Sequence, residues 1–239
     1  MITFENVTKT YGDKRAVDNL SMTIEDGQIF SFLGPNGAGK TTSIKLMTGI
    51  VAPDSGTIKL DGIDIAKDPM EAKRRFGFVP DTFDMYERLT GRDYLRFMGD
   101  IYGVGKEQRK AHIEKYLSLF SLEDAYDQQI RSYSHGMKQK LAIIGALMHD
   151  PSIWILDEPM VGLDPQSVFM LKEEMRAHAD KGRTVFFSTH VLDVAERLCD
   201  QIGIIKQGQL IAKGTLEQLR GEGDGTLEEL FLELVEKGE

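Results

Sequence analysis

Apolar positions recur along the chain with two different periods. Residues 1–85 carry period-two alternation and short apolar runs, which are typical of β-strands. Residues 86–150 instead repeat apolar positions every three or four residues, as amphipathic helices do. Short apolar runs return after residue 150 and alternate with helical segments. The pattern therefore predicts a strand-rich core that is interrupted by a helical insert.

The first part of the chain is expected to mix antiparallel strands with one strand–loop–helix unit. Apolar residues alternate with polar ones from Ile2 to Lys9, which predicts a strand at the edge or surface of a sheet. The apolar run Ile29–Leu33 predicts a buried strand, and Thr42–Ile50 after it is expected to be helical. Further strands are predicted at 16–25, 56–62 and 76–79.

The insert is expected to contain three helices, each with one apolar stripe. Such stripes face a core more often than a binding partner, by about four to one, so burial is expected. The stripes are Tyr94, Phe97, Met98, Ile101 and Tyr102 in the first helix, Ile113, Tyr116, Leu117 and Phe120 in the second, and Met137, Leu141, Ile144 and Met148 in the third.

The core resumes after the insert with buried strands and helices in alternation. Strands are predicted at 153–156 and 184–188, and helices from Pro165 and at 191–198. Asp164 is expected to cap the first of these helices. A hairpin is expected over 202–213, a linker at 222–225, and an amphipathic terminal helix that carries Leu227, Leu230, Phe231, Leu234 and Val235.

Composition narrows the class of protein. A net charge of -9 and a pI of about 5.2 weigh against a nucleic-acid-binding surface. The single cysteine, Cys199, excludes an internal disulfide and indicates a reducing compartment. The longest apolar run, Leu141–Met148, is much shorter than the roughly 20 residues that span a bilayer, and the N-terminus lacks a secretory-signal pattern. The chain is therefore expected to be soluble by itself and to reach a membrane only through a partner.

A glycine-rich loop between the strand at 29–33 and the helix at 42–50 fits the pattern G-x-x-x-x-G-K-[ST]. Its backbone N–H groups are expected to surround nucleotide phosphates, with Lys40 at the β- and γ-phosphates and the Thr41 hydroxyl on Mg²⁺. The pattern therefore predicts ATP and Mg²⁺ as ligands. The loop residues expected to bind the nucleotide are Gly34, Pro35, Asn36, Gly37, Ala38, Gly39, Lys40, Thr41 and Thr42.

Two acidic residues follow the buried strand at 153–156. Asp157 is expected in the magnesium site, and Glu158 is the candidate general base for an attacking water. His190 ends the strand at 184–188, where ligands bind in an α/β sheet, and is expected to contact the γ-phosphate and orient Glu158. An exposed acidic turn and a structural histidine are the less favoured alternatives.

A second anion site is indicated before the third helix of the insert. Ser134 is a helix cap, and Gly136 opens the first turn of the helix behind it. This segment lies far from the glycine-rich loop in the chain, so the chain would carry two separate half-sites for phosphate. An ordinary helix cap explains the same residues equally well.

The motifs together resemble the ATP-binding subunit of an ABC transporter over residues 1–220. The motifs that carry the resemblance are Tyr11, Gly34–Thr41, the loop at Asp81, Ser134-His135-Gly136-Met137-Lys138-Gln139-Lys140, Ile155-Leu156-Asp157-Glu158-Pro159, Gly162-Leu163-Asp164-Pro165 and Ser188-Thr189-His190. The resemblance implies an α/β P-loop NTPase fold, with a RecA-like core, an antiparallel β-subdomain and an inserted α-helical subdomain. It divides the chain into a core (1–85 and 151–220), the helical subdomain (86–150), and a linker with the terminal helix (221–239).

The same resemblance implies a head-to-tail dimer that closes on two ATP molecules. Each site would join the glycine-rich loop of one cassette to Ser134 and Gly136 of a second, and a homodimer is favoured. Tyr11 would stack on adenine, and Asp164 would lie at the dimer seam. Asp81 stands where the family usually has a glutamine, and it is expected near Mg²⁺. His135 and Met137 also depart from the family's usual Leu-Ser-Gly-Gly-Gln signature.

The expected function is ATP hydrolysis that powers substrate translocation, by export, through a separate transmembrane permease on the cytoplasmic face of the membrane. Phe83, Met85 and Tyr86 form an apolar cluster that either receives a helix of the permease or packs within the insert. A soluble ABC ATPase of the assembly-scaffold type is the alternative, and a P-loop kinase would leave Ser134 without a role.

Overall fold

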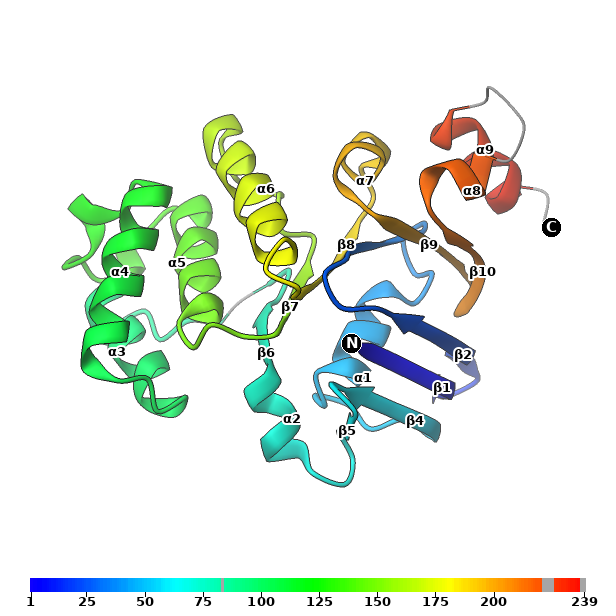
Figure 1. The fold of residues 1–239 in the computed structure, drawn as a ribbon, viewed down its shortest axis with the longest axis horizontal. Helices are drawn as coiled ribbons and strands as arrows, with labels where there is room; N and C mark the ends of the chain where they lie inside the picture. Colours follow the sequence, from blue (N-terminus) through cyan, green and yellow to red (C-terminus); the bar gives the residue numbers. More distant parts are fainter. Residues whose placement is uncertain (83, 221–225, 237–239) are drawn as a thin grey trace.

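The computed structural model describes residues 1–82, 84–220 and 226–236, without the side chain of Glu236. Figure 1 shows a strand-rich body that carries the N-terminus, and a layer of helices beside it. The predicted linker at 222–225 and Phe83 lie outside the described residues. None of the helices in the described ranges has both the length and the apolar composition that a membrane crossing requires.

The antiparallel sheet corrects one prediction from the sequence. Its strand order is β2 (Lys14–Ile24), β1 (Ile2–Tyr11), β4 (Ser55–Leu60), β5 (Ile63–Asp64). The first strand is thus internal, so its prediction as an edge strand is wrong, whereas the exposed Glu5, Asn6 and Tyr11 agree with a surface strand. The alternation of apolar and polar residues did not predict the buried positions correctly, because β1 is irregular. Asn6 has a φ of 50°, and the register of the pairing with β2 shifts between Phe4 and Val7. Phe4 and Val7 are therefore both buried despite their odd spacing.

The second sheet contains the predicted buried strands. Its order is β10 (Gln209–Gly214), β9 (Gln201–Lys206), β3 (Ile29–Leu33), β8 (Thr184–Thr189), β7 (Ile153–Asp157), β6 (Phe76–Val79). All pairs are parallel except the predicted hairpin of β9 and β10, which is antiparallel. The carboxyl ends of β3, β7 and β8 meet at one edge, where Leu33 pairs with Thr189 and Asp157 with Ser188.

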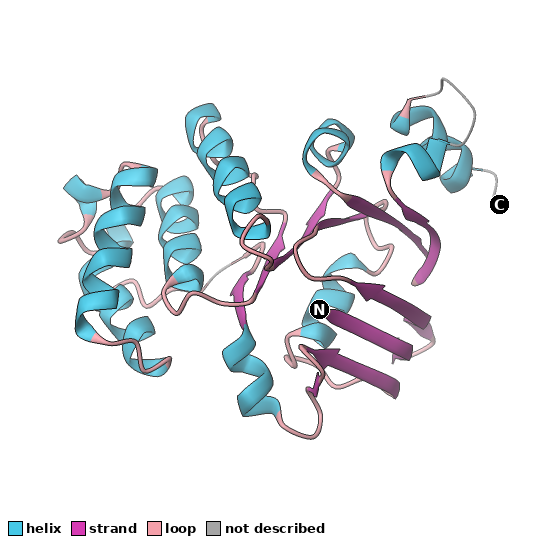
Figure 2. Ribbon diagram, in the orientation of Figure 1, coloured by secondary structure: helices cyan, strands magenta, loops and turns pink. Residues whose placement is uncertain are grey.

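The helices lie around this sheet and beside it (Figure 2). Asp164 accepts a hydrogen bond from the backbone N–H of Ser167 and caps α6, as predicted. The helices are α1 (Lys40–Met47), α2 (Pro69–Arg75), α3 (Gly91–Ile101), α4 (Lys106–Phe120), α5 (His135–Leu147), α6 (Pro165–Ala179), α7 (Leu192–Leu198), α8 (Leu216–Arg220) and α9 (Leu227–Glu236), with short 3₁₀ turns η1 (Glu123–Ala125) and η2 (Ile130–Ser132).

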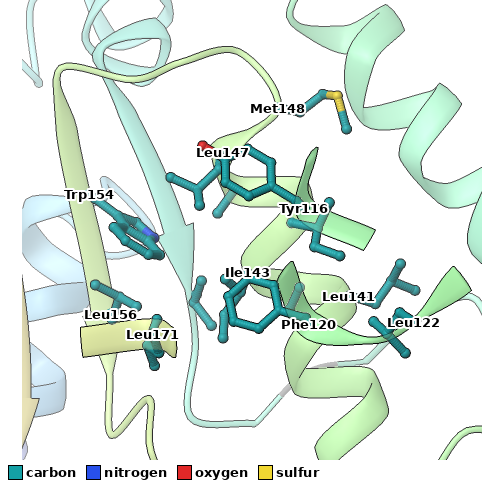
Figure 3. Close-up of a cluster of buried hydrophobic side chains, with 14 of the residues drawn as sticks. Tyr116, Phe120, Leu122, Leu141, Ile143, Leu147, Met148, Trp154, Leu156 and Leu171 are labelled. Atoms are coloured by element: carbon teal, nitrogen blue, oxygen red, sulfur yellow. The ribbon is translucent and has the colours of Figure 1, made fainter. Parts of the chain in front are cut away.

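The core of the helical insert is continuous with the parallel sheet. Figure 3 shows side chains from α4 and α5, such as Phe120 and Ile143, meeting Trp154 and Leu156 of β7. The predicted stripe of α4 is buried throughout. In α5, Leu141 and Met148 are buried as predicted, but the helix is buried on nearly all sides.

Helix α3 departs from its predicted burial. Leu95 faces the core, and Tyr94 packs over Gly145 of α5. Phe97 and Ile101 are instead 46% and 59% exposed, so the prediction that the whole stripe is buried is wrong. Helix α5 covers only part of the apolar stripe of α3. Phe97 and Ile101, three and seven residues after Tyr94, lie on the side of α3 that faces away from the core.

The terminal helix α9 confirms its predicted amphipathic character. Leu227 is fully buried, and Leu230, Phe231 and Leu234 pack with it against residues of β9 and α7.

Candidate functional site

The glycine-rich loop connects β3 to α1 at the carboxyl edge of the parallel sheet. Gly37 and Gly39 have φ angles of 78° and 112°, which L-residues with a side chain rarely adopt. A Cβ on Gly39 would also collide with the carbonyl of Ala16. The backbone N–H of Gly208 donates to the Ala38 carbonyl at 2.8 Å, so the β9–β10 turn supports the loop from behind.

A cavity of about 350 Å³ opens in front of the loop. Its lining brings together most of the residues that the sequence assigns to nucleotide and metal binding. They are Tyr11, Asn36, Gly37, Ala38, Gly39, Lys40, Thr41, Thr42, Asp81 and Glu158, joined by Lys14 and Ala16. Gly34 and Pro35 lie at the start of the same loop, where their carbonyls accept hydrogen bonds from Lys40.

Lys40 lies inside the curl of the loop rather than in solvent. Its Nζ donates to the carbonyl oxygens of Gly34 at 2.5 Å and Pro35 at 3.2 Å. Burial lowers the pKa of Lys40, while the charges of Glu158 and Asp157 act in the opposite direction. The ammonium is thus held by its own loop and by the carboxylates that follow β7, in position to meet phosphate oxygens.

Asp157 is a buried carboxylate at the end of β7. It accepts a hydrogen bond from the Ser188 hydroxyl at 2.5 Å. Burial raises its pKa, and hydrogen bonds from Ser188 and Thr41 partly oppose that shift. A cation beside Asp157 would stabilise its charged form, because the carboxylate has lost much of its hydration.

The residues around Asp157 fit a magnesium ion that is shared with a nucleotide. Thr41 offers a hydroxyl, and the negative charge of Asp81 is close enough to raise the pKa of Asp157. No cluster of three or more acidic, histidine or cysteine side chains in the described ranges is arranged to hold a metal alone. Mg²⁺ commonly takes one or two carboxylates and completes its shell with phosphate oxygens and water.

Glu158 occupies an unusual backbone position next to this pair. Its φ of 48° is in the left-handed region, which costs a residue with a side chain on the order of 1–2 kcal/mol. Its N–H donates to the Ser188 hydroxyl at 3.1 Å, which helps to hold that conformation. The Oε2 atom of Glu158 lies 3.0 Å from Nδ1 of His190. His190 thus contacts Glu158, which lines the cavity, although His190 itself is not among the lining residues.

Ser134 and Gly136 do not line this cavity. Ser134 caps α5 by accepting a hydrogen bond from the Met137 N–H at 3.2 Å. A Cβ on Gly136 would lie 2.7 Å from the carbonyl oxygen of Gly162, so only glycine allows this approach. The two predicted phosphate half-sites are therefore separate within one chain.

A hydrogen bond and an ion pair connect the start of α5 to the segment that follows Glu158. The buried Gln139 donates from Nε2 to the carbonyl of Pro159 at 3.0 Å. The Lys140 ammonium lies 2.9 Å from an Asp164 carboxylate oxygen, and hydrogen bonds from Ser167 together with Lys140 hold the pKa of Asp164 far below its usual range. The second half-site is thus anchored on the loop that leads away from Glu158.

Three residues of the site were not found from the sequence. Lys14 and Ala16 line the cavity, and Gly208 supports the loop. Lys14 follows the predicted Tyr11 by a short turn, and this adjacency was the available signal. The contribution of Gly208 depends on tertiary contact between a distant hairpin and the loop, which no local pattern reports.

Comparison with known proteins identifies the family. The model of the ABC transporter family matches residues 17–161. Linearmycin resistance ATP-binding protein LnrL of Bacillus subtilis (strain 168) is 40% identical over 92% of this chain and 70% of its own length. Nod factor export ATP-binding protein I of Burkholderia lata is 38% identical over 89% of this chain and 70% of its own length.

Solved structures agree with this chain in fold, and one of them is a dimer. The structure of an ATP-binding subunit of an ABC transporter superposes with a TM-score of 0.94 and 33% identity, over 98% of this chain and 99% of the other. A dimeric ATP-binding cassette in a post-hydrolysis state with ADP and Pi gives a TM-score of 0.81 and 26% identity, over 90% and 98% of the two chains. The chain therefore belongs to the ABC transporter family, and it is an ATP-binding, ATP-hydrolysing cassette.

Proposed function

We propose that this cassette dimerises and powers export through a separate transmembrane permease, to which it is bound on the cytoplasmic face of the membrane. The observation that carries the transport part is an exposed apolar surface between the strand-rich body and the helical insert. The division of the chain into a core (1–85 and 151–220), a helical subdomain (86–150) and a terminal segment (221–239) fits these roles.

In the hydrolysis step, Glu158 accepts a proton from the water that attacks the γ-phosphate. His190, 3.0 Å away, holds the Glu158 carboxylate and reaches the γ-phosphate. Lys40 and the loop N–H groups bind the phosphates, and Tyr11 stacks on adenine at the open end of the cavity. Asp157, Thr41 and Asp81 would hold Mg²⁺, which neutralises charge on the phosphates when it is bound.

The second half of each site comes from another copy of the chain. Ser134 and Gly136 expose a helix N-terminus that has no phosphate partner within its own chain, and the cavity in front of Lys40 is open on one side. In the dimer, Ser134 of one chain would contact the γ-phosphate held by Lys40 of the other. The dimeric cassette with ADP and Pi supports this arrangement.

The exposed apolar surface, which we name the docking surface, spans α3, the segment before α3 and the segment that follows α1. Tyr86 and Phe97 contact edge to face, with ring centroids 6.5 Å apart. Cavities of about 440 Å³ and 270 Å³ lie on the two sides of α3. The docking surface consists of Ile50, Tyr86, Phe97 and Ile101, all of them exposed.

An amphipathic helix of the permease suits this surface. Its apolar side chains would cover Tyr86 and Phe97, since exposed apolar patches of this kind mark interaction sites. Lys73 and Arg88 line the two cavities, so an acidic residue on the incoming helix would be complemented. Met85 is half-buried against the core of the insert, which separates it from the docking surface.

The names of the two relatives, one a resistance protein and the other an export protein, support export as the direction. The test is to tag this chain, solubilise the membranes of its host with mild detergent, and identify what co-purifies. A stoichiometric multispanning membrane protein is expected. Recovery of soluble assembly proteins alone would contradict the transporter role and favour a scaffold ATPase.

A further inference from the structure

A cavity of about 580 Å³ lies on the outer side of the helical insert, away from the ATP site. Helix α4 runs beside α3 there (Figure 1). The α4 side chains of the lining follow a helical face from its first residue, Lys106, through Ile113 to Leu117. The lining contains Arg92, Arg96, Lys106, Arg109, Lys110, Ile113, Glu114, Leu117 and Tyr126.

The side chains that line this cavity carry a net positive charge, whereas the whole molecule is negatively charged. Five cationic side chains and one carboxylate line it, whereas the whole chain carries a net charge of -9. Some of these cationic side chains form ion pairs with neighbouring carboxylates. Arg92 forms two hydrogen bonds to Asp127, at 2.5 and 2.8 Å, and stacks on the Tyr126 ring at 4.4 Å. Arg109 pairs with Asp100 at 2.7 Å.

Two cations of the lining have no carboxylate within ion-pair distance in the described part of the chain. They are Arg96 on α3 and Lys106 at the start of α4, so they stand on the two walls of the cavity. These groups together suit a phosphate better than a monovalent, compact anion such as chloride.

The floor of the cavity is apolar. Ile113 and Leu117 are buried there, and the Tyr126 ring forms one side. We propose that this cavity binds a phosphate group that carries an organic body, with Arg96 and Lys106 on the phosphate and the organic part against Ile113 and Leu117.

Two sources offer this chemistry: the headgroup of an anionic phospholipid and a soluble phosphorylated metabolite. The lipid source rests on the proposed function, because α3 also carries Phe97 and Ile101 of the docking surface and would then lie near the membrane. The soluble source does not depend on the membrane partner.

The test uses the purified full chain without any partner, so its outcome is independent of the transport proposal. Binding is measured by flotation with phosphatidylcholine vesicles, with and without phosphatidylglycerol, and by calorimetry with glycerol 3-phosphate. The variant is Arg96→Ala/Lys106→Ala. The charge-matched control is Lys172→Ala/Lys181→Ala, on and after α6, and thermal unfolding confirms that both variants are folded.

Removal of two cations near an anionic surface should weaken binding about 30-fold, whereas the control should change it only a few-fold. Such a loss with phosphatidylglycerol vesicles alone identifies the lipid source, and the same loss with glycerol 3-phosphate identifies the soluble source. The proposal is overturned by equal losses in both variants or by the absence of binding to every probe.

Discussion

At the scale of single residues, the site depends on a few backbone conformations that side chains elsewhere make possible. Glu158 adopts a left-handed conformation while its N–H is held by Ser188, and the same hydroxyl binds Asp157. The sequence predicts Asp157 and Glu158 from their place after a buried strand. It does not predict that Ser188 links them, because that contact joins residues on two different strands.

Substitution of the candidate base is the sharpest test at this scale. Glu158→Gln keeps the size and polarity of the side chain but removes its ability to accept the proton, so kcat should fall by about 100-fold or more. The affinity for ATP should stay within a few-fold of wild type in a filter-binding assay. Glu173→Gln, on the exposed side of α6, serves as the matched control. Near-normal turnover of Glu158→Gln would remove Glu158 from the catalytic role.

A buried histidine predicts how stability depends on pH. His178 is buried against Trp154, and burial lowers its pKa from 6.5 to about 4. The unfolded chain binds a proton at this residue below about pH 6.5 and the folded chain does not, so stability falls as the pH decreases toward 4. The His178→Phe variant should therefore lose about 2 kcal/mol less unfolding free energy than wild type between about pH 7.5 and pH 5.

Urea unfolding at the two pH values measures this difference. His149, whose pKa burial also lowers to about 4, remains in the variant and should leave some pH dependence. Equal pH dependence in His178→Phe and wild type would show that His178 is not held neutral by burial.

At the scale of elements, the sequence predicts the type of helix and strand better than the face each one buries. Leu141 and Ile144 of α5 and the stripe of α4 are buried as their spacing indicates. The stripe of α3 is only partly buried, because the neighbouring helix contacts the side of Tyr94 and Leu95 and leaves Phe97 outside. Periodicity locates an apolar face, but tertiary packing decides how much of it is covered.

A buried carboxylate joins the insert to the core. Glu174 of α6 accepts hydrogen bonds from Tyr116 at 3.1 Å and Lys115 at 2.7 Å, both on α4. Burial and the Glu174 charge raise the pKa of Tyr116 well above its usual range, so its hydroxyl remains a donor. Tyr116→Phe leaves the packing intact and removes one bond to a buried charge, which should lower the unfolding free energy by about 1–2 kcal/mol.

Urea unfolding of Tyr116→Phe beside Tyr102→Phe checks this prediction. Tyr102 stacks on His149 through its ring, with centroids 3.6 Å apart, and its loss of a hydroxyl should change the stability by less than about 0.5 kcal/mol. A neutral Tyr116→Phe variant would show that Glu174 does not bind the insert to the core through this residue.

At the scale of the whole molecule, exposed apolar residues occur on two surfaces that the sequence could not separate. Tyr11 lines the ATP cavity, whereas Tyr86 and Phe97 belong to the docking surface. Local patterns predicted the motifs and the insert, but both surfaces are assembled from distant segments. Their location depends on the tertiary arrangement alone.

The docking surface can be tested apart from catalysis. Phe97→Asp places a charge at its centre and should abolish co-purification of the permease, while the ATPase activity of the isolated chain stays within about twofold, since surface changes are usually mild. Leu232→Asp on α9 is the matched control, because Leu232 and Phe97 are each 46% exposed. Equal permease recovery with Phe97→Asp and with Leu232→Asp would place the contact elsewhere.

The central claim is that each ATP site is completed by a second copy of the chain. Its most direct measurement is the mass of Glu158→Gln, by analytical ultracentrifugation with saturating ATP and Mg²⁺. A dimer of the 26.8 kDa chain is expected, because ATP binds without being consumed. Glu158→Gln/Ser134→Arg should bind ATP and remain monomeric. A Glu158→Gln protein that stays monomeric with ATP bound, or a double variant that dimerises as well, would contradict the claim.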